Sequence, residues 1–141
     1  MRILVKPALH AMKYPLTSIK CGDDKVAGMW VSIGYRTKDG EQHVLHIVGG
    51  EQADAQPAGR MPVPIYFERD DQSLSCYAGA EKILVTERSV TVTLNKNGKD
   101  SLELPKTVEF AAEKPGRDFK KARAIFAEMK KRHSGEIIHV G

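Results

Sequence analysis

The sequence predicts an α+β fold, in which one C-terminal amphipathic helix packs on an antiparallel meander sheet. Apolar runs with strand-like alternation, separated by turn signals, follow one another from residue 25 to residue 112. A helical spacing of apolar residues appears only after residue 116. Strands that precede a separate helix are typical of an α+β arrangement. The length of 141 residues suits one domain, so we expect a single domain over residues 1–141.

The first predicted sheet element is a hairpin. KVAGMWVSIGY (residues 25–35) is rich in β-branched and aromatic residues, Asp39-Gly40 is a turn signal, and EQHVLHIVGG (residues 41–50) follows as the second strand. The composition then changes, because GGEQADAQPAGRMPVP (residues 49–64) is small, polar and Pro-rich. We therefore expect a mobile loop over about residues 49–62.

A second group of strands follows this loop. VPIYFER (residues 63–69) predicts a strand, and pairing across a turn at Asp70–Ser73 aligns Phe67 with Cys76. Aspartate at the first position of such a turn accepts a hydrogen bond from its own backbone, which favours a type I turn. LSCYAGAEKILVT (residues 74–86) contains one or two further strands, with Gly79 marking a bulge or bend.

The meander continues through SVTVTL (residues 89–94), whose valines alternate with threonines. A three-residue loop at Lys96–Gly98, with Gly98 left-handed, pairs Val92 with Leu102 and keeps apolar residues on one face, which a two-residue loop does not. The residues expected on that buried face are Ile83, Val85, Val90, Val92, Leu102 and Leu104. TVEFAA (residues 107–112) then predicts another strand.

The predicted helix is RDFKKARAIFAEMKKRH (residues 117–133), followed by a short last strand in EIIHV (residues 136–140). Its apolar stripe, at spacings of three and four, consists of Phe119, Ala122, Phe126, Met129 and His133. Its other faces carry cations, among them Arg117, Lys120, Lys121, Arg123, Lys130 and Lys131. A solvated helix face is the first explanation of these charges, and a nucleic-acid-associated module is the alternative.

The densest chemistry lies in YFERDDQSLSCYAG (residues 66–79). An Asp-Asp-Gln-Ser turn explains part of it, but a turn does not require the neighbouring acids, amide and tyrosines together. That excess is typical of a recognition surface. The residues we assign to partner binding are Glu68, Asp70, Asp71, Gln72 and Tyr77.

Catalytic and metal-binding motifs are absent from the sequence. His43 and His46 lie three apart on a predicted strand, so their side chains point to opposite faces. The chain has no calcium loop, no GxSxG elbow and no glycine-rich phosphate loop. We therefore expect no enzyme, no metal, no cofactor and no small-molecule substrate. The alternative is a small hydrolase that uses Glu68 with Asp70 or Asp71 as its acid–base pair.

The bulk composition limits partners and compartment. A net charge of +4 is too mild to demand nucleic acid, and the apolar runs are too short to span a membrane. The N-terminal apolar patch is interrupted by charge, unlike a secretory signal, so we expect a cytoplasmic protein. Cys21 and Cys76, the only cysteines, are then expected to be reduced.

Residues 65–94, IYFERDDQSLSCYAGAEKILVTERSVTVTL, resemble the central signature of the tenth family of bacterial polymorphic-toxin immunity proteins. In that signature an aromatic-x-Glu strand end enters an acidic Asp-Gln turn, followed by a Ser-x-Tyr-x-Gly step and two alternating strands. The matching positions are Tyr66, Glu68, Asp70, Asp71, Gln72, Ser75, Tyr77 and Gly79.

The resemblance implies a cytoplasmic protein without catalysis that binds and blocks one cognate toxin domain, as in contact-dependent inhibition. Inhibitors of nucleases are usually acidic. The net charge of +4 then implies either a toxin that is not a nuclease or recognition by the acidic middle of the chain. Tyr66, Ser75 and Gly79 fit a structural role as well as a role in recognition.

Overall fold

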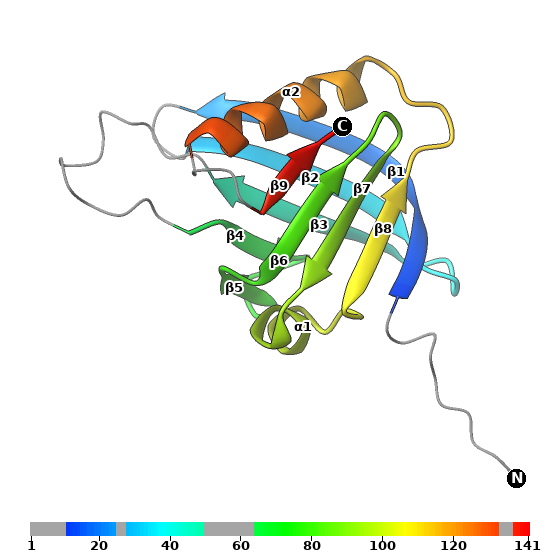
Figure 1. Cartoon of the computed structure of the whole chain (residues 1–141). Coiled ribbons are helices and arrows are strands. Elements are labelled where there is room, and N and C mark those ends of the chain that lie inside the picture. The colour runs from blue at the N-terminus through cyan, green and yellow to red at the C-terminus, as the bar shows by residue number, and fades with distance from the viewer. Residues whose placement is uncertain (1–10, 25–27, 50–63, 133–136) are drawn as a thin grey trace, which may run out of the picture.

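The structure is a computed structural model that describes residues 11–24, 28–49, 64–132 and 137–141. In these residues the chain forms one nine-stranded sheet and two helices (Figure 1). The elements in chain order are β1 (Ala11–Asp24), β2 (Gly28–Arg36), β3 (Gln42–Gly49), β4 (Tyr66–Arg69), β5 (Ser75–Tyr77), β6 (Ala80–Val85), β7 (Ser89–Leu94), α1 (Lys96–Leu102), β8 (Thr107–Ala111), α2 (Arg117–Arg132) and β9 (Ile138–Val140).

The α+β class is confirmed, but the expected antiparallel meander is wrong in part. The strand order is β5-β4-β3-β2-β1-β8-β7-β6-β9. β1 lies parallel to β8, and β6 lies parallel to β9, whereas the other neighbouring strands are antiparallel. Hairpins between consecutive strands are visible in a sequence, but a parallel pair joins distant segments without a local signal.

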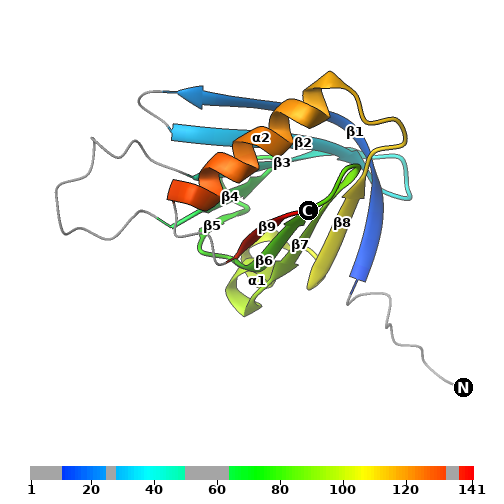
Figure 2. The same ribbon diagram turned by 45° about the horizontal axis from the view of Figure 1, so that its top comes forward.

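β1 is the strand that joins the two halves of the sheet. Its first residues, Ala11 to Pro15, pair with β8, and its later residues pair with β2. A register shift lies between Leu16 and Ser18, and bulges of this kind bend a strand. The sheet consequently folds over, with β2–β5 on one side and β6–β9 on the other (Figures 1 and 2). The sequence did not predict β1, because Pro15 interrupts the segment and its apolar alternation is poor.

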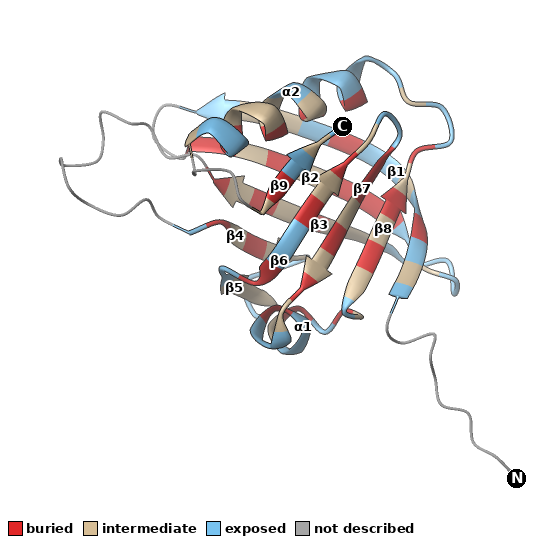
Figure 3. Cartoon of the chain, viewed as in Figure 1, coloured by how far each residue is buried: buried red, intermediate tan, exposed pale blue. Residues whose placement is uncertain are grey.

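The core fills the space between the two halves. Figure 3 shows buried residues alternating along the strands of both halves and on the underside of α2. At the bend, Tyr35 of β2 contacts Tyr14 of β1 and Phe110 of β8, with ring centroids 5.1 and 4.9 Å apart. Burying a side chain the size of Phe110 stabilises the fold by roughly 1.5–3 kcal/mol. The aromatic cluster therefore holds the two halves together at β1.

Local strand pairs were predicted well. Ile83 pairs with Val92 and Val85 pairs with Val90, all of them buried, as expected from the alternation. Phe67 pairs with Cys76, and the β2–β3 hairpin is present. β6 also has its bulge after Ala80, close to Gly79.

The predicted hairpin loop at Lys96–Gly98 is wrong, because these residues begin α1. The Asn95 side chain caps the helix by accepting a hydrogen bond from the Gly98 amide at 2.8 Å. Gly98 is thus helical, and Val92 pairs with Val108 of β8 instead of Leu102. Asn-Gly is a hairpin signal, but asparagine is equally a preferred helix N-cap. The sheet therefore carries a second helix that the fold prediction lacked.

α2 and β9 confirm the predicted C-terminal elements. Phe119, Ala122, Phe126 and Met129 form the buried stripe of α2, and His133 lies outside the described residues. α2 and α1 lie at opposite ends of the folded sheet (Figures 1 and 2). Neither described helix combines the length and apolar content needed to cross a membrane. The predicted loop at 49–62 also lies outside the described residues, apart from Gly49, which ends β3.

Candidate functional site

The turn between β4 and β5 begins one residue later than predicted. Leu74 donates its amide hydrogen to the Asp71 carbonyl at 3.1 Å, so Asp71 is the first residue of the turn. Its carboxylate accepts hydrogen bonds from the amide and the hydroxyl of Ser73. These bonds, the hydroxyl first, hold the pKa of Asp71 below its ordinary value. Asp71 therefore combines a structural bond with an exposed negative charge.

Asp70 joins the turn to β3. Its backbone has a φ of 65°, a conformation that Asp and Asn adopt more readily than other non-glycine residues. Its carboxylate accepts a hydrogen bond from the Val44 amide at 2.9 Å and lies 2.7 Å from His43 Nδ1. His43 in turn stacks on Tyr35 at 5.5 Å. The functional groups of Asp70 are therefore committed to holding the fold.

Arg69 is a structural residue that the sequence did not reveal. Its guanidinium donates to the Tyr35 hydroxyl at 3.1 Å and to the carbonyls of Leu102 and Glu103 at 3.2 Å each. The carbonyls at the end of a helix lack partners within it, so Arg69 both caps α1 and ties it to β4. Burial raises the pKa of the Tyr35 phenol, and the charge of Arg69 opposes that effect.

Of the other predicted residues, Glu68 and Tyr77 lie on the outer face of β2–β5, which is turned away from α2, and Gln72 lies in the turn. Phe67 is fully buried, so Tyr66 and Glu68 on either side of it point outward. The Tyr66 hydroxyl donates to Glu68 Oε1 at 2.7 Å. This bond to Glu68, followed by burial, raises the pKa of the Tyr66 phenol. Tyr66 therefore fixes the position of the Glu68 carboxylate on this face.

Strand register extends this face into two rows that cross four strands. One row runs Trp30, Val48, Tyr66, Tyr77, and the other runs Ser32, His46, Glu68, Ser75. We call these eight residues the tyrosine patch. The rings of Tyr66 and Tyr77 lie 5.0 Å apart at 51°. Tyr77 is 57% exposed. Among the described residues it is the one large hydrophobic residue that is mostly exposed.

Two edges of the patch are fixed by close contacts. A Cβ on Gly22 of β1 would lie 2.7 Å from the indole nitrogen of Trp30, so the indole lies directly on the Gly22 backbone. The Ser32 hydroxyl lies 2.6 Å from His46 Nδ1. Ser75 donates its hydroxyl hydrogen to the Gln72 carbonyl at 2.7 Å. The Gln72 side chain takes no part in this bond, and Gln72 is exposed. The sequence had not placed Trp30, Ser32, His46 or Val48 in the site, because this requires the register of β2 to β4.

Gly79 has a structural reason to be glycine. A Cβ on Gly98 would lie 2.0 Å from the Gly79 carbonyl oxygen, and a Cβ on Gly79 would lie 2.5 Å from Cys76 Sγ. The Asn95 amide also donates to the Gly79 carbonyl at 2.9 Å. The backbone immediately before β6 and the backbone of α1 therefore touch at these two glycines. Gly79 belongs to the packing of α1 and not to the exposed face.

The acid–base pair proposed for a hydrolase does not come together as a free pair. Glu68 is bound to Tyr66, Asp70 is bound to His43 and Val44, and Asp71 is bound to Ser73. Within the described ranges, no cluster of three or more His, Cys, Asp or Glu residues could hold a metal ion. Cys21 and Cys76 are free thiols whose pKa values are raised by burial.

The cations of α2 divide into two groups. Arg123 donates to the carbonyl of Gly141, Arg132 lies 3.7 Å from Asp23, and Lys131 lies 3.4 Å from Glu128. These three cations are engaged with the fold or with the helix itself. Arg117, Lys120, Lys121 and Lys130 are exposed. A nucleic-acid surface would need a continuous stripe of available cations. Contacts within the protein engage Arg123, Arg132 and Lys131, so fewer α2 cations remain available for such a stripe.

Comparison with protein families gives one result. The family model described as Immunity protein 10 matches residues 17–120, which is more than half of the chain and includes the whole tyrosine patch. No curated protein and no solved structure gives a significant match. The matched region confirms the resemblance noted over residues 65–94 and extends it to β2, β3 and β8. The chain therefore belongs to the Immunity protein 10 family.

Proposed function

We propose that this chain is an immunity protein of the cytoplasm that binds and neutralises one cognate toxin domain and has no catalysis of its own. Membership of the Immunity protein 10 family supports toxin neutralisation in general. The structure adds one observation that supports a particular surface, since Tyr77 is 57% exposed beside Tyr66 and Glu68 on a sheet face without a helix. Exposed aromatic residues are typical of interface anchors.

The tyrosine patch is the proposed toxin-binding surface. Tyr77 supplies the apolar anchor, and Glu68, held by Tyr66, supplies a fixed negative charge for a cation of the toxin. Pre-organised groups cost less entropy on binding than groups that must first be ordered. Asp71 and Gln72 lie at the end of β4 and form the rim. Asp70 is reassigned to the fold, because both of its carboxylate oxygens are engaged.

The function is tested by co-expression of this chain with the C-terminal domain encoded by a large toxin gene in the adjoining reading frame. Growth of cells that carry both proteins, and co-purification of the two, is the expected result. A toxin domain that still kills in the presence of the folded chain would overturn the proposed function.

The site is tested separately by three substitutions that leave the turn intact. Asp71→Asn keeps an oxygen for the Ser73 amide but removes the charge, and Gln72→Ala leaves the Gln72 carbonyl bonded to Ser75. Glu68→Gln removes the charge of the patch while an oxygen remains for Tyr66. Each is expected to lower toxin affinity with little change in unfolding temperature. Rim residues have small effects, so roughly 0.5–1 kcal/mol is expected for Asp71 and Gln72 and more for Glu68.

A further inference from the structure

A groove lies at the bend of β1, lined by different residues from the tyrosine patch. Its volume is about 670 Å³. Its lining comes from the bend itself, the end of β2, the β6–β7 turn and the end of β8. The residues that matter here are Tyr14, Leu16, Arg36, Arg88, Ala112 and Glu113, and we call this site the arginine groove. The proposed function uses none of these residues.

The rim of the arginine groove is cationic. Arg36 ends β2 and Arg88 lies in the β6–β7 turn, both exposed. Neither guanidinium has a hydrogen bond or ion pair to any part of the chain that the structure describes. Lys13 also lines the groove and has only a 3.9 Å ion pair with Glu109 between exposed side chains, which is weak. Among the described residues that line the groove, Glu113 is the single acid, against the cations Lys13, Arg36 and Arg88.

The floor of the groove is apolar and its walls are held in place. The Ala112 amide donates to the Arg88 carbonyl at 2.7 Å, which fastens the β6–β7 turn to the residue after β8. Tyr14 is only 9% exposed and stacks on Tyr35. Leu16 is partly buried against the core. The backbone of the bend and of the β6–β7 turn is therefore held in place, and the exposed guanidiniums of Arg36 and Arg88 lie at the edge of an apolar floor.

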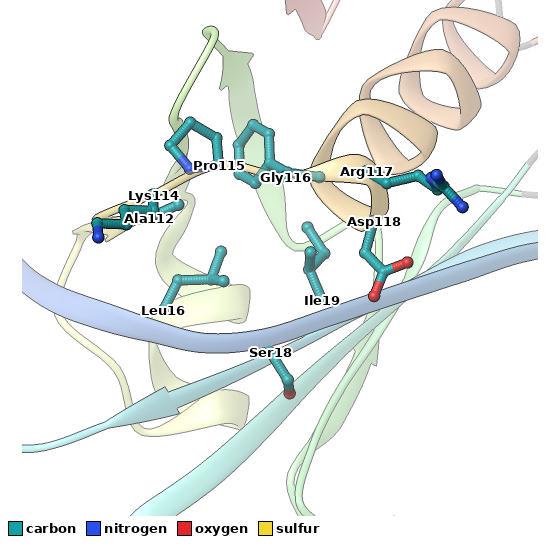
Figure 4. Close-up of a pocket in the computed structure, with 10 residues that line it drawn as sticks. Leu16, Ser18, Ile19, Ala112, Lys114, Pro115, Gly116, Arg117 and Asp118 are labelled. Atoms are coloured by element: carbon teal, nitrogen blue, oxygen red, sulfur yellow. The ribbon is translucent and has the colours of Figure 1, made fainter.

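A second depression of about 530 Å³ continues the groove toward α2 and shares Leu16 and Ala112 with it. Figure 4 shows Leu16 and Ile19 pointing from β1 toward the segment that leads into α2, whereas the Arg117 side chain points away. Phe119 also lines this part, and Lys114 adds a cation at its edge. Asp118 also lines this second depression, so the excess of positive charge lies at the arginine groove, and the apolar base continues past Leu16 and Ala112 toward α2.

We propose that the arginine groove binds an extended acidic segment of the protein partner. Aspartate or glutamate side chains pair with Arg36 and Arg88, and an apolar side chain between them rests on Leu16 and Ala112. Guanidinium groups bind carboxylates in a bidentate manner. Because the guanidiniums of Arg36 and Arg88 have no partner in the described part of the chain, their charges are available to complement an acidic segment. That the partner is the toxin rests on the proposed function, whereas the acidic character of the segment rests on the groove alone.

The groove favours a peptide over a nucleic acid. Single-stranded nucleic acids are held by bases that stack on exposed aromatic side chains. The aromatic residues that line the groove and its continuation, Tyr14 and Phe119, are 9% and 2% exposed. Neither ring can offer a stacking face. The remaining apolar lining is aliphatic, which suits a leucine or valine of an extended peptide.

The test uses the full chain and a fluorescein-labelled peptide in which glutamate alternates with leucine. Two control probes are the same peptide with glutamine for glutamate and a single-stranded oligonucleotide of equal charge. The expected result is saturable binding of the glutamate peptide that weakens at least about tenfold in Arg36→Glu/Arg88→Glu, or about 1.4 kcal/mol. Lys82→Glu/Lys130→Glu, which changes the net charge equally at exposed residues outside the groove, is expected to bind as the unmodified chain does.

Four results would overturn the proposal. These are equal binding of the glutamine peptide, equal weakening by both double variants, stronger groove-dependent binding of the oligonucleotide than of the peptide, and a dimer in sedimentation that the groove variant dissociates. The last would make a second copy of the chain the occupant. Should the charge reversals not fold, Arg36→Gln/Arg88→Gln removes the same charges without repulsion and is expected to weaken peptide binding in the same direction.

The groove and the proposed function can fail independently. If the chain protects cells from the toxin but does not bind the glutamate peptide, the groove inference is wrong and the proposed function stands. If it binds the peptide through Arg36 and Arg88 but does not protect, the proposed function is wrong and the groove stands.

Discussion

The Asp70 carboxylate lies 2.7 Å from His43 Nδ1, and its other oxygen accepts a hydrogen bond from the Val44 amide at 2.9 Å. The Asp70 amide donates to the Val44 carbonyl as well, also at 2.9 Å. Asp70 thus belongs to the strand pairing of β3 and β4, although in the sequence it lies between the surface acids Glu68 and Asp71. The three acids therefore have different roles. Asp70 stabilises the fold, whereas Glu68 and Asp71 carry negative charge on the surface.

Asp70→Ala is expected to destabilise the fold by about 1–2 kcal/mol, because the Val44 amide and His43 lose their partner. Asp70→Asn is expected to cost less, since the amide oxygen still accepts from Val44 and asparagine tolerates the left-handed backbone. Urea denaturation measures both values. An alanine variant that is as stable as the unmodified chain but binds toxin poorly would return Asp70 to the interface.

The lowered pKa of Asp71 gives the stability of the fold a pH dependence that Ser73→Ala is expected to reduce, although the Ser73 amide still donates to the carboxylate. The folded-state pKa of Asp71 is lowered, chiefly by the Ser73 hydroxyl, so the charged form is favoured by folding. The resulting stabilisation is present above the unfolded-state pKa near 3.8 and is lost as pH falls through the folded-state pKa. Ser73→Ala is therefore expected to be less stable at neutral pH and to converge with the unmodified chain in acid.

Urea midpoints over a pH series measure this convergence, and an NMR titration of Asp71 reports its pKa directly. Asp39 is a matched control, because its pKa is also lowered by a threonine hydroxyl, Thr37, in another turn. A pKa of Asp39 that moves together with Asp71 in Ser73→Ala would contradict the assignment.

Gly98→Ala tests the contact between α1 and β6. In an exposed helix interior this substitution would stabilise by about 1 kcal/mol. Here the added Cβ would lie 2.0 Å from the Gly79 carbonyl oxygen, and such overpacking costs about 1–3 kcal/mol. We expect a lower unfolding temperature. Gly116→Ala is the control, because a Cβ there has nothing within 4 Å, and its effect should be small or stabilising.

Arg69→Met tests the capping of α1 from β4. The substitution leaves the buried Tyr35 hydroxyl and the Leu102 and Glu103 carbonyls without the guanidinium. A loss of about 2–4 kcal/mol is expected, because buried polar groups lose their partners. In a double-mutant cycle, Tyr35→Phe should then cost less in Arg69→Met than in the unmodified chain. Additive effects would show that the two side chains are not coupled.

Local pattern predicted the elements whose partners are adjacent in sequence. The pairs Ile83–Val92 and Phe67–Cys76 follow from alternation and loop length, and α2 follows from its apolar stripe. The strand β8 was predicted at residues 107–112, but β1 and its parallel pairing with β8 did not follow, since no short-range signal links Tyr14 to Phe110. α1 did not follow either, because Asn97-Gly98 is a hairpin signal that competes with the N-cap preference of Asn95.

The candidate site was predicted in part for the same reason. The excess of polar residues identified the β4–β5 region, and Glu68 and Tyr77 do lie on one exposed face. Trp30 and His46 join them through strand pairing, which requires the register of three strands. No motif in the sequence distinguishes Arg69, Arg36 and Arg88 from other cations, and only the folded sheet places Arg69 against α1 and the other two beside one groove.

Tyr77 gives the most direct test of the central claim that the tyrosine patch holds the toxin. The measurement is the calorimetric Kd between the purified chain and an inactivated toxin domain from the adjoining reading frame, for Tyr77→Ala and for Lys82→Ala on β6 as control. Because Tyr77 is exposed at the edge strand, neither change should alter stability by more than about 0.5 kcal/mol. The account predicts that Tyr77→Ala loses about 2 kcal/mol of binding, roughly thirtyfold in Kd, and that the control is unchanged. An unchanged Kd for Tyr77→Ala would contradict it.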